Sequence, residues 1–222
     1  MRPDAPRQAH IRVARTARYW TWGPLDADAP VWFVLHGYRQ LAHRFIARFE
    51  PLVSAGCTVV APEALSRFYL DDDTGPHGPD AHVGATWMTR EDRLSEIRDY
   101  VDYLDALHAR ILGPATERAV VTLGFSQGAA TASRWAALGG AHIDRLILWA
   151  GRLPPDLEPG DAVARLKTRA LTYVVGADDR WAGPAAIAEE QARLREHGIE
   201  CTVLDHPGGH RIEEEPLRRL LT

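Results

Sequence analysis

Short runs of apolar residues, many of them β-branched, recur along the chain and are separated by longer segments that mix polar and apolar positions. Runs of this length bounded by polar or turn residues predict β-strands. Runs that are apolar throughout are typical of strands buried on both faces, as in a parallel sheet. The sequence predicts strands at 31–35, 57–61, 119–123, 145–149, 171–175 and 201–204.

Helical periodicity appears between most of these runs. The clearest case is 90–111, where apolar residues recur three or four positions apart and acidic residues gather on the opposite face. Gly113-Pro114 then ends the predicted helix. Because parallel strands need crossover connections, strands that alternate with amphipathic helices predict an α/β fold, with helices on both faces of a mostly parallel sheet.

Two segments depart from this alternation. Residues 62–89 are rich in aspartate, glycine and proline and predict a long irregular loop, which in a compact domain is often functional. Near the N-terminus, Ile11, Val13, Ala17 and Tyr19 alternate with polar residues and predict an edge strand rather than a targeting peptide. No repeat or linker interrupts the chain, so we expect one domain over residues 1–222.

Charge and composition narrow the range of partners. A formal net charge of -4 gives no broad basic field, which argues against nucleic acids and anionic membranes as partners. No stretch approaches the length of a membrane span, and the first residues lack the apolar core of a signal peptide, so we expect a cytoplasmic protein. The two cysteines, Cys57 and Cys201, lie in apolar runs and are expected to be buried free thiols.

The motif Gly124-Phe125-Ser126-Gln127-Gly128 follows the predicted strand at 119–123 and precedes a helical pattern. In Gly-x-Ser-x-Gly, a sharp strand-to-helix turn exposes the serine oxygen, and the glycines let neighbouring backbone approach closely. In sheets of this type, ligands bind at the carboxyl ends of the strands, which is where Ser126 falls. Ser126 is therefore a candidate nucleophile.

A serine hydroxyl is a weak nucleophile and needs a base, which is in turn oriented by an acid. Two acids, Asp178 and Asp179, follow the strand at 171–175, and two histidines, His206 and His210, follow the strand at 201–204. Both pairs lie at carboxyl ends of predicted strands, beside the predicted position of Ser126. The residues alone leave the choice within each pair open.

With these motifs in this order, the chain resembles the phospholipase/carboxylesterase group of α/β-hydrolases, which includes acyl-protein thioesterases and is similar to the dienelactone hydrolases. The resemblance spans nearly the whole chain and implies an α/β-hydrolase fold without a separate cap domain. The matching pieces are Leu35-His36-Gly37, the serine motif through Ala129, the segment 150–154, Gly176-Ala177-Asp178-Asp179 and Gly209-His210.

The resemblance implies a role for particular residues. It selects Asp179 as the acid and His210 as the base, with His206 as the alternative base. It also implies an oxyanion hole made by the backbone N–H groups of Tyr38 and Gln127. This chain departs from the family pattern at Arg39-Gln40, where a second glycine is common.

The implied function is a serine carboxylesterase that hydrolyses short- to medium-chain acyl esters through an acyl-enzyme and needs no cofactor or metal. Trp87 and Met88, at the end of the irregular segment, and Trp181 are the candidate substrate-binding residues. The expected partner is a small-molecule ester, and a homodimer is compatible with this function. The alternatives are acyl-protein thioesterase or lysophospholipase-like activity, and a non-catalytic binding protein on a hydrolase fold.

A metal site is a further alternative for the segment 62–89. Its acids and histidines carry ligand atoms, but their spacing fits no compact metal-binding motif, and an acidic tract rich in glycine and proline is more often a solvated loop. The residues concerned are Asp71, Asp72, Asp73, His77, Asp80 and His82.

Overall fold

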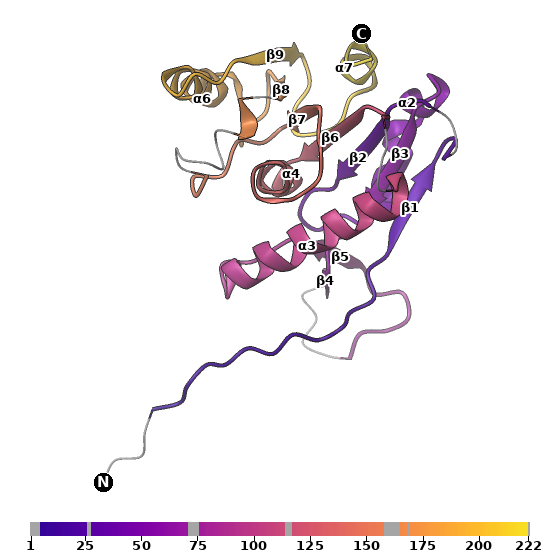
Figure 1. Ribbon diagram of the computed structural model, residues 1–222, viewed down its shortest axis with the longest axis vertical. Helices are drawn as coiled ribbons and strands as arrows, with labels where there is room; N and C mark the ends of the chain where they lie inside the picture. Colours follow the sequence, from indigo (N-terminus) through magenta and orange to yellow (C-terminus); the bar gives the residue numbers. More distant parts are fainter. Residues whose placement is uncertain are drawn as a thin grey trace.

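The centre of the computed structural model, which describes residues 5–25, 28–70, 76–113, 117–157, 165–167 and 169–221, is a seven-stranded sheet (Figure 1). Its strand order is β1-β3-β2-β6-β7-β8-β9. All neighbouring strands are parallel except β1, which is antiparallel to β3. The predicted α/β fold with a mostly parallel sheet is therefore confirmed. The strands are β1 (Tyr19–Trp22), β2 (Val31–Leu35), β3 (Thr58–Pro62), β6 (Val120–Phe125), β7 (Arg145–Trp149), β8 (Ala170–Gly176) and β9 (Cys201–His206).

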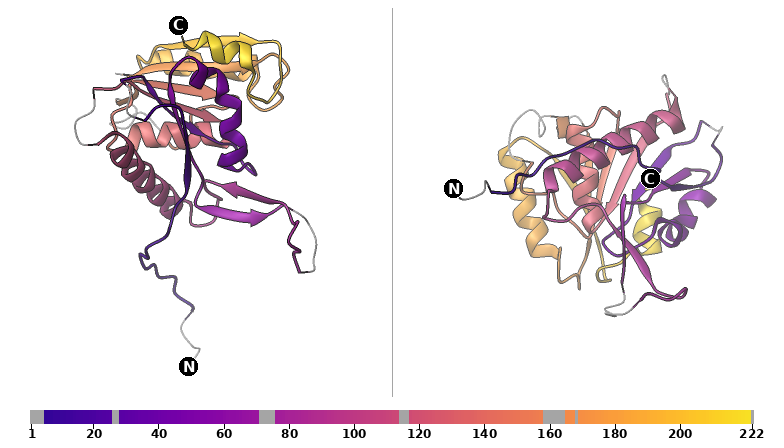
Figure 2. Two further views of the ribbon diagram at one scale, coloured as in Figure 1. Left: turned by 90° about the vertical axis from the view of Figure 1, so that its right-hand side faces the viewer. Right: turned by 90° about the horizontal axis from the view of Figure 1, so that it is seen from below.

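Helices cover both faces of the sheet (Figure 2). Successive side chains of a strand point to opposite faces, and both sets are apolar here, so each face needs a layer of helices to bury it. In β2, Phe33 and Leu35 belong to one buried cluster, and Trp32 belongs to the other. No separate cap domain is evident in the described part of the chain. The first cluster includes α3 (Arg93–Leu112), α4 (Gln127–Leu138) and α6 (Pro184–Glu196). The second includes α1 (Ala42–Phe45), the 3-10 helix η1 (Ile46–Phe49), α2 (Glu50–Ser54) and α7 (Glu214–Arg219).

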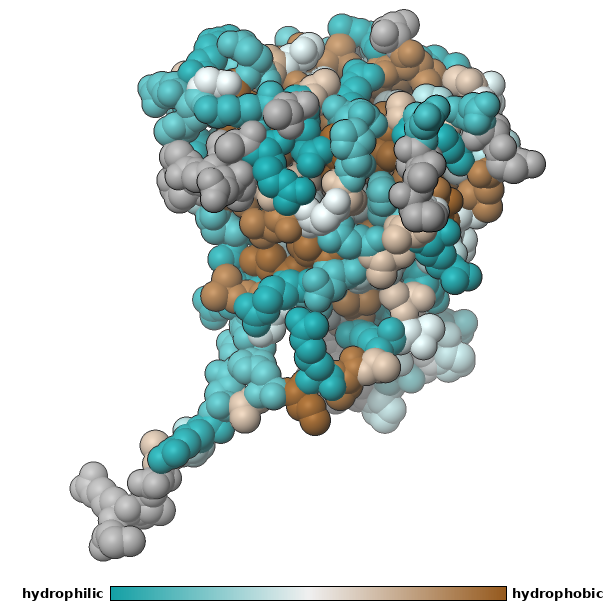
Figure 3. All heavy atoms as spheres, in the orientation of Figure 1, coloured by the Kyte–Doolittle hydropathy of each residue, from teal (hydrophilic) through white to brown (hydrophobic). Residues whose placement is uncertain are grey.

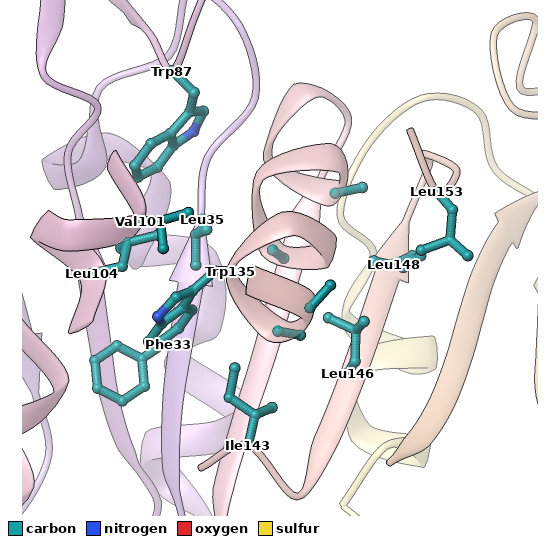
Figure 4. Close-up of a cluster of buried hydrophobic side chains, with 14 of the residues drawn as sticks. Phe33, Leu35, Trp87, Val101, Leu104, Trp135, Ile143, Leu146, Leu148 and Leu153 are labelled. Carbon is teal, nitrogen blue, oxygen red and sulfur yellow. The ribbon is translucent and has the colours of Figure 1, made fainter. Parts of the chain in front are cut away.

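The helix α4 packs tightly on the sheet because it turns small buried residues toward the strands. Ala129, Ala132 and Ala136 are all fully buried. Trp135 fills the larger space beside β2, with its ring centroid 5.3 Å from that of Phe33 in an edge-on arrangement (Figure 4). Close packing of this kind leaves little room for α4 to shift. The residue that precedes α4, Ser126, is therefore held firmly against the sheet.

The prediction of an irregular loop over 62–89 was wrong in part, because this segment contains the antiparallel hairpin of β4 (Ser66–Tyr69) and β5 (Val83–Thr86). The two short strands pair only with each other. β4 alternates half-buried and exposed residues, and β5 contains glycine and small buried residues, so neither strand shows a continuous apolar run. The hairpin projects from the body (Figure 2) and is fixed at its base. There the N–H of Arg39 donates to the carbonyl of Ala85, and the N–H of Ala85 donates to the carbonyl of Gln40.

The predicted N-terminal edge strand is shorter than expected. It begins only at Tyr19, and Ile11 and Val13 are 85% and 77% exposed on an arm that extends from the body (Figure 1). The pairing of β1 with β3 starts where Tyr19 lies opposite Pro62. The N–H of Glu63 still donates to the carbonyl of Arg18, but before Arg18 no backbone hydrogen bond joins the described part of the arm to β3. The alternating pattern at 11–19 therefore lacks the partner strand that it needs.

The remaining predicted elements agree with the structure within a few residues. The helix predicted at 90–111 is α3, and the six predicted strands are β2, β3, β6, β7, β8 and β9. Both cysteines are free, with Cys57 buried and Cys201 partly buried. Hydrophilic side chains predominate on the face in Figure 3, with hydrophobic patches among them. Among the described helices, none is both long enough and apolar enough to cross a membrane. The single domain over residues 1–222 stays a prediction.

Candidate active site

The turn between β6 and α4 holds Ser126 in an unusual backbone conformation. Its φ of 53° and ψ of -115° are rare for a residue with a side chain. The N–H of Ser126 donates to the carbonyl of Trp149 at 2.9 Å, which ties the turn to β7. The glycines of the motif are required by close contacts: a Cβ on Gly124 would lie 2.2 Å from the carbonyl oxygen of Gly128, and one on Gly128 would lie 2.2 Å from that of Leu35.

Ser126, His210 and Asp179 form one chain of hydrogen bonds. The Nε2 atom of His210 lies 2.9 Å from Oγ of Ser126, and its Nδ1 atom lies 2.9 Å from Oδ2 of Asp179. An ionised carboxylate only accepts hydrogen bonds, so Nδ1 carries the proton and donates it to Asp179. Nε2 of the neutral ring is then the acceptor for the Ser126 hydroxyl. This is the tautomer that a base acting on a serine requires.

The loops that carry Asp179 and His210 are joined to each other at the carboxyl edge of the sheet. The N–H of Ala177 donates to the carbonyl of His206, and the N–H of Asp178 donates to that of Gly208. The loop after β8 and the loop after β9 are therefore positioned as a unit.

Asp179 is buried, with 6% of its surface exposed. Burial acts to raise the pKa of its carboxyl group. Hydrogen bonds from the N–H groups of Trp181 and Ala182 and from His210 act in the opposite direction and outweigh burial, so the pKa lies below its usual value. The carboxylate is therefore ionised at neutral pH. Its Oδ1 atom is used by the two amides, which leaves Oδ2 to orient His210.

The structure separates the paired candidates by position. Asp178 is exposed, whereas its neighbour Asp179 contacts His210. His206 is 4% exposed and accepts a hydrogen bond at Nδ1 from the N–H of Gly208, while its Nε2 has no hydrogen-bond partner among the described residues. Of the two histidines, only His210 lies within hydrogen-bond distance of Ser126 in the described structure.

The loop after β2 contains the candidate oxyanion amide of Tyr38. Its neighbours on both sides are already engaged: the N–H of Gly37 donates to Oε1 of Gln40 at 2.8 Å, and the N–H of Arg39 donates to Ala85. The N–H of Tyr38 has no acceptor among the described residues. Arg39 has a φ of 68°, in the left-handed region that favours glycine, so the arginine takes the backbone conformation of the expected glycine.

The His36 ring holds the same loop in place through hydrogen bonds at both of its nitrogens. It is fully buried, donates from Nδ1 to the carbonyl of Gly37 and accepts at Nε2 from the N–H of Ala64. Because one nitrogen donates and the other accepts, the ring is neutral. Burial holds the pKa of His36 below its usual value of 6.5, despite opposing effects from the Gly37 hydrogen bond and Glu63.

The side chain of Gln127 links the serine turn to the end of β5. Its Oε1 atom accepts from the N–H of Trp87 at 3.1 Å, and its Nε2 atom donates to the carbonyl of Met88 at 2.9 Å. The indole N–H of Trp87 in turn donates to the carbonyl of His36. The family resemblance pointed only to the backbone amide of Gln127 and did not predict this side-chain role. The position of Gln127 beside Ser126 was the only signal available for it.

The three candidate substrate-binding residues lie in different environments. Trp87 is 2% exposed and packs in the first core cluster, beside His36 and Tyr100. Figure 4 shows its indole at one end of that cluster. Met88 is half-buried, and Trp181 is 80% exposed. Trp87 therefore contacts the loop after β2 from inside the protein, whereas Met88 and Trp181 are accessible to a ligand.

A family model for serine hydrolases (FSH1) matches residues 31–215, which include all of the motifs above. The chain belongs to the serine hydrolase (FSH1) family. No protein of curated function matches the sequence. The recognition of a serine hydrolase from the serine motif and the order of the acid and histidine candidates is thus confirmed.

Solved structures of esterases and thioesterases share the fold of this serine hydrolase. Esterase PE8 is 21% identical, with a TM-score of 0.66 over 93% of this chain and 96% of its own. Acyl-protein thioesterase 2 of Zea mays is 18% identical, with a TM-score of 0.63 over 92% and 96%. A carboxylesterase from Mesorhizobium loti is 20% identical, with a TM-score of 0.66 over 88% and 89%. At these identities, the likeness shows the α/β-hydrolase fold.

The alternative of a metal site concerns residues that the structure describes only in part. Asp71, Asp72 and Asp73 lie outside the described residues. Within the described ranges, no group of three or more histidine, cysteine or acidic side chains could hold a metal ion.

Because His36 is buried and neutral, the free energy of unfolding should depend on pH. Because its pKa is lowered in the folded protein, the unfolded chain takes up a proton first as the pH falls below 6.5. The free energy of unfolding should then decrease below pH 6.5, at up to about 1.4 kcal/mol per pH unit for this one group. Burial lowers the pKa of His206 and His108 too, which adds to the same trend.

Urea unfolding at pH 7.5 and at pH 5.0 measures this effect, and His36→Gln should reduce the decrease. If the parent were equally stable or more stable at pH 5.0, these histidines would not be the cause of a loss of stability in acid.

Proposed function

We propose that this serine hydrolase is a carboxylesterase that cleaves short- to medium-chain acyl esters through an acyl-enzyme on Ser126. The observation that carries the proposal is the chain of two 2.9 Å contacts from Ser126 through His210 to Asp179. The strained backbone of Ser126 adds to it, since backbone strain clusters at functional sites.

In the proposed reaction, His210 removes the proton of the Ser126 hydroxyl at Nε2 while Oγ attacks the ester carbonyl. The C–O bond to the alcohol then breaks, and His210 returns the proton to the departing alkoxide oxygen. Water then attacks the acyl carbonyl while Nε2 of His210 takes one of its protons. The bond from the acyl carbon to Oγ of Ser126 breaks, His210 returns the proton to Oγ, and the carboxylic acid leaves. Asp179 keeps the proton of His210 on Nδ1 and stabilises the imidazolium that forms at each step.

The carbonyl oxygen becomes negative in each tetrahedral intermediate, and we assign its stabilisation to the N–H groups of Gln127 and Tyr38. Gln127 is the first residue of α4, where N–H groups have no acceptor within the helix and the helix dipole favours negative charge. In the loop after β2, the engagement of Gly37 and Arg39 leaves Tyr38 as the amide available to substrate.

A thioester or lysophospholipid substrate would use the same three side chains, so the choice of substrate depends on the walls of the site. The projecting hairpin β4–β5 supports a modest acyl pocket, because it brings Phe68 against Tyr38, with ring centroids 5.4 Å apart. An intact hydrogen-bonded chain argues against a purely binding role.

Cytoplasmic location and homodimer formation stay predictions.

Replacing Ser126 by alanine should remove nearly all ester turnover and leave the fold intact, because only the nucleophile is lost. Loss of a triad residue commonly lowers the rate by about 10⁴- to 10⁶-fold. Initial rates with p-nitrophenyl butyrate, together with circular dichroism as a check on folding, measure both effects. If Ser126→Ala kept turnover within tenfold of the parent, Ser126 would not be the nucleophile.

The two adjacent acids form a matched pair of variants. Asp179→Asn should lower kcat by about 10⁴-fold, because an amide cannot hold His210 in the required tautomer. Asp178→Asn should remain close to the parent, because that side chain is exposed and lies outside the hydrogen-bonded chain. Steady-state rates of the two variants test the choice, and the reverse ranking would transfer the role to Asp178.

Activity should depend on the length of the acyl chain. Each buried methylene contributes about 0.8 kcal/mol until the chain reaches the wall of the pocket. We therefore expect kcat/KM to rise from acetyl to butyryl or hexanoyl p-nitrophenyl esters and to fall for long chains. Met88→Ala should move the optimum to longer chains. An optimum at palmitoyl in the parent would favour a lipid or acylated protein as substrate.

A further inference from the structure

A buried arginine, Arg134, lies two turns after Gln127 on α4 and has 5% of its side chain exposed. Its Nε and one terminal nitrogen bind the two carboxylate oxygens of Asp156, at 2.9 and 2.6 Å. The other terminal nitrogen lies 3.2 Å from the hydroxyl of Tyr100 and 3.4 Å from the sulfur of Met88. One side chain thus joins α4 to α3, to the segment after β5 and to the segment after β7.

Two of these contacts hold Met88 from the same helix. Gln127 binds its backbone carbonyl, and Arg134 contacts its thioether. Residues seven positions apart lie on one face of a helix, so α4 presents both groups to Met88. The conformation of Met88, which is otherwise a flexible side chain, is thereby restricted at both ends.

Asp156 anchors the segment that follows β7 and passes the nucleophile. This segment begins with Ala150, whose φ is 51°, and Gly151, where a Cβ would lie 2.9 Å from the carbonyl oxygen of Ser126. Arg134 therefore connects two segments, one at Met88 and one at 150–156, that both reach the serine turn.

The chemistry of the pair is unusual for a packing role. Arg134 is buried while Asp156 keeps 28% of its side chain exposed, so the pair removes mainly the guanidinium charge from water. Apolar residues of similar volume are often equally stable or more stable at the position of a buried charge pair. The benefit of the pair is then directional: the guanidinium fork fixes the angle and register of its partners, which apolar side chains do not.

We propose that the Arg134–Asp156 pair is a positioning element that sets acyl-chain selectivity by fixing Met88 and the segment 150–156 as opposite walls of the pocket for a linear acyl group. This proposal rests on the proposed esterase function. Neither residue takes part in the chemistry on Ser126, so the pair acts on how the acyl chain binds.

The test replaces the ion pair by apolar residues in the double variant Arg134→Met with Asp156→Leu. The measured quantity is the ratio of kcat/KM for the hexanoyl ester to that for the acetyl ester, beside the midpoint of thermal unfolding. We expect the ratio to fall about tenfold, with acetyl turnover within about threefold of the parent, because only the longer chain reaches the walls. The unfolding midpoint should stay close to the parent's.

Arg93→Met is the matched control. Arg93 also binds Asp156, at 2.9 Å, but its side chain is one-third exposed, and among the described residues it has no contact with Met88. Its ratio should equal that of the parent. Asp156→Asn, which keeps the shape of the side chain, carries the test if the double variant does not fold, and its ratio should also fall.

The outcomes separate this proposal from the function on which it rests. A parent that hydrolyses neither ester overturns the esterase proposal and this one with it. If the parent is active, an unchanged ratio in the folded variants overturns the positioning role alone. Equal loss with both esters also overturns it, because a role limited to stability would lower turnover without regard to chain length.

Discussion

The backbone of Ser126 is the constraint on which the rest of the site depends. A φ of 53° is strained for a residue with a side chain, so the turn persists only where the surrounding structure holds it. The turn also brings neighbouring backbone into close contact on both sides. Gly124 and Gly128 allow that approach, and the hydrogen bond to the carbonyl of Trp149 holds it. Because β6 lies inside the sheet and α4 packs on it through small residues, the turn cannot relax without disturbing the core.

The other parts of the site are built from neighbouring strands with the same rigid base. Asp179 follows β8 and His210 follows β9, so the proposed acid and the proposed base reach Ser126 from the same edge of the sheet. The loop after β2 reaches it from the other side and is held by Gln40, His36 and the hairpin β4–β5. Ordered in this way, the proposed oxyanion donors and the hydrogen-bonded chain would need little reorganisation during a reaction.

Local patterns in the sequence were enough to predict the elements that form by burial. The strands that carry Ser126, Asp179 and His210 appear as apolar runs, and the resemblance to a family then ordered the candidate residues. The hairpin β4–β5 was missed because its pairing and the contact of Ala85 with the loop after β2 depend on residues distant in sequence. The same reason explains the missed side-chain roles of Gln127 and Arg134, since their partners lie in segments that no periodicity connects to α4.

The failed extension of the N-terminal strand has the opposite cause. The alternation at Ile11 and Val13 is a valid strand pattern, but the pairing with the segment of β3 stops at the contact between Glu63 and Arg18. A sequence pattern therefore predicts an element reliably only where the fold also supplies its partner.

The central claim is that Ser126 is an activated nucleophile. A fluorophosphonate probe reacts with activated serine hydroxyls and leaves ordinary serine hydroxyls unmodified, so it tests this claim without any choice of substrate. After brief labelling of the folded protein at pH 7.5, peptide mass mapping should find the adduct on Ser126, and His210→Ala should abolish it. An unlabelled parent, or an adduct on a different serine, would contradict the account.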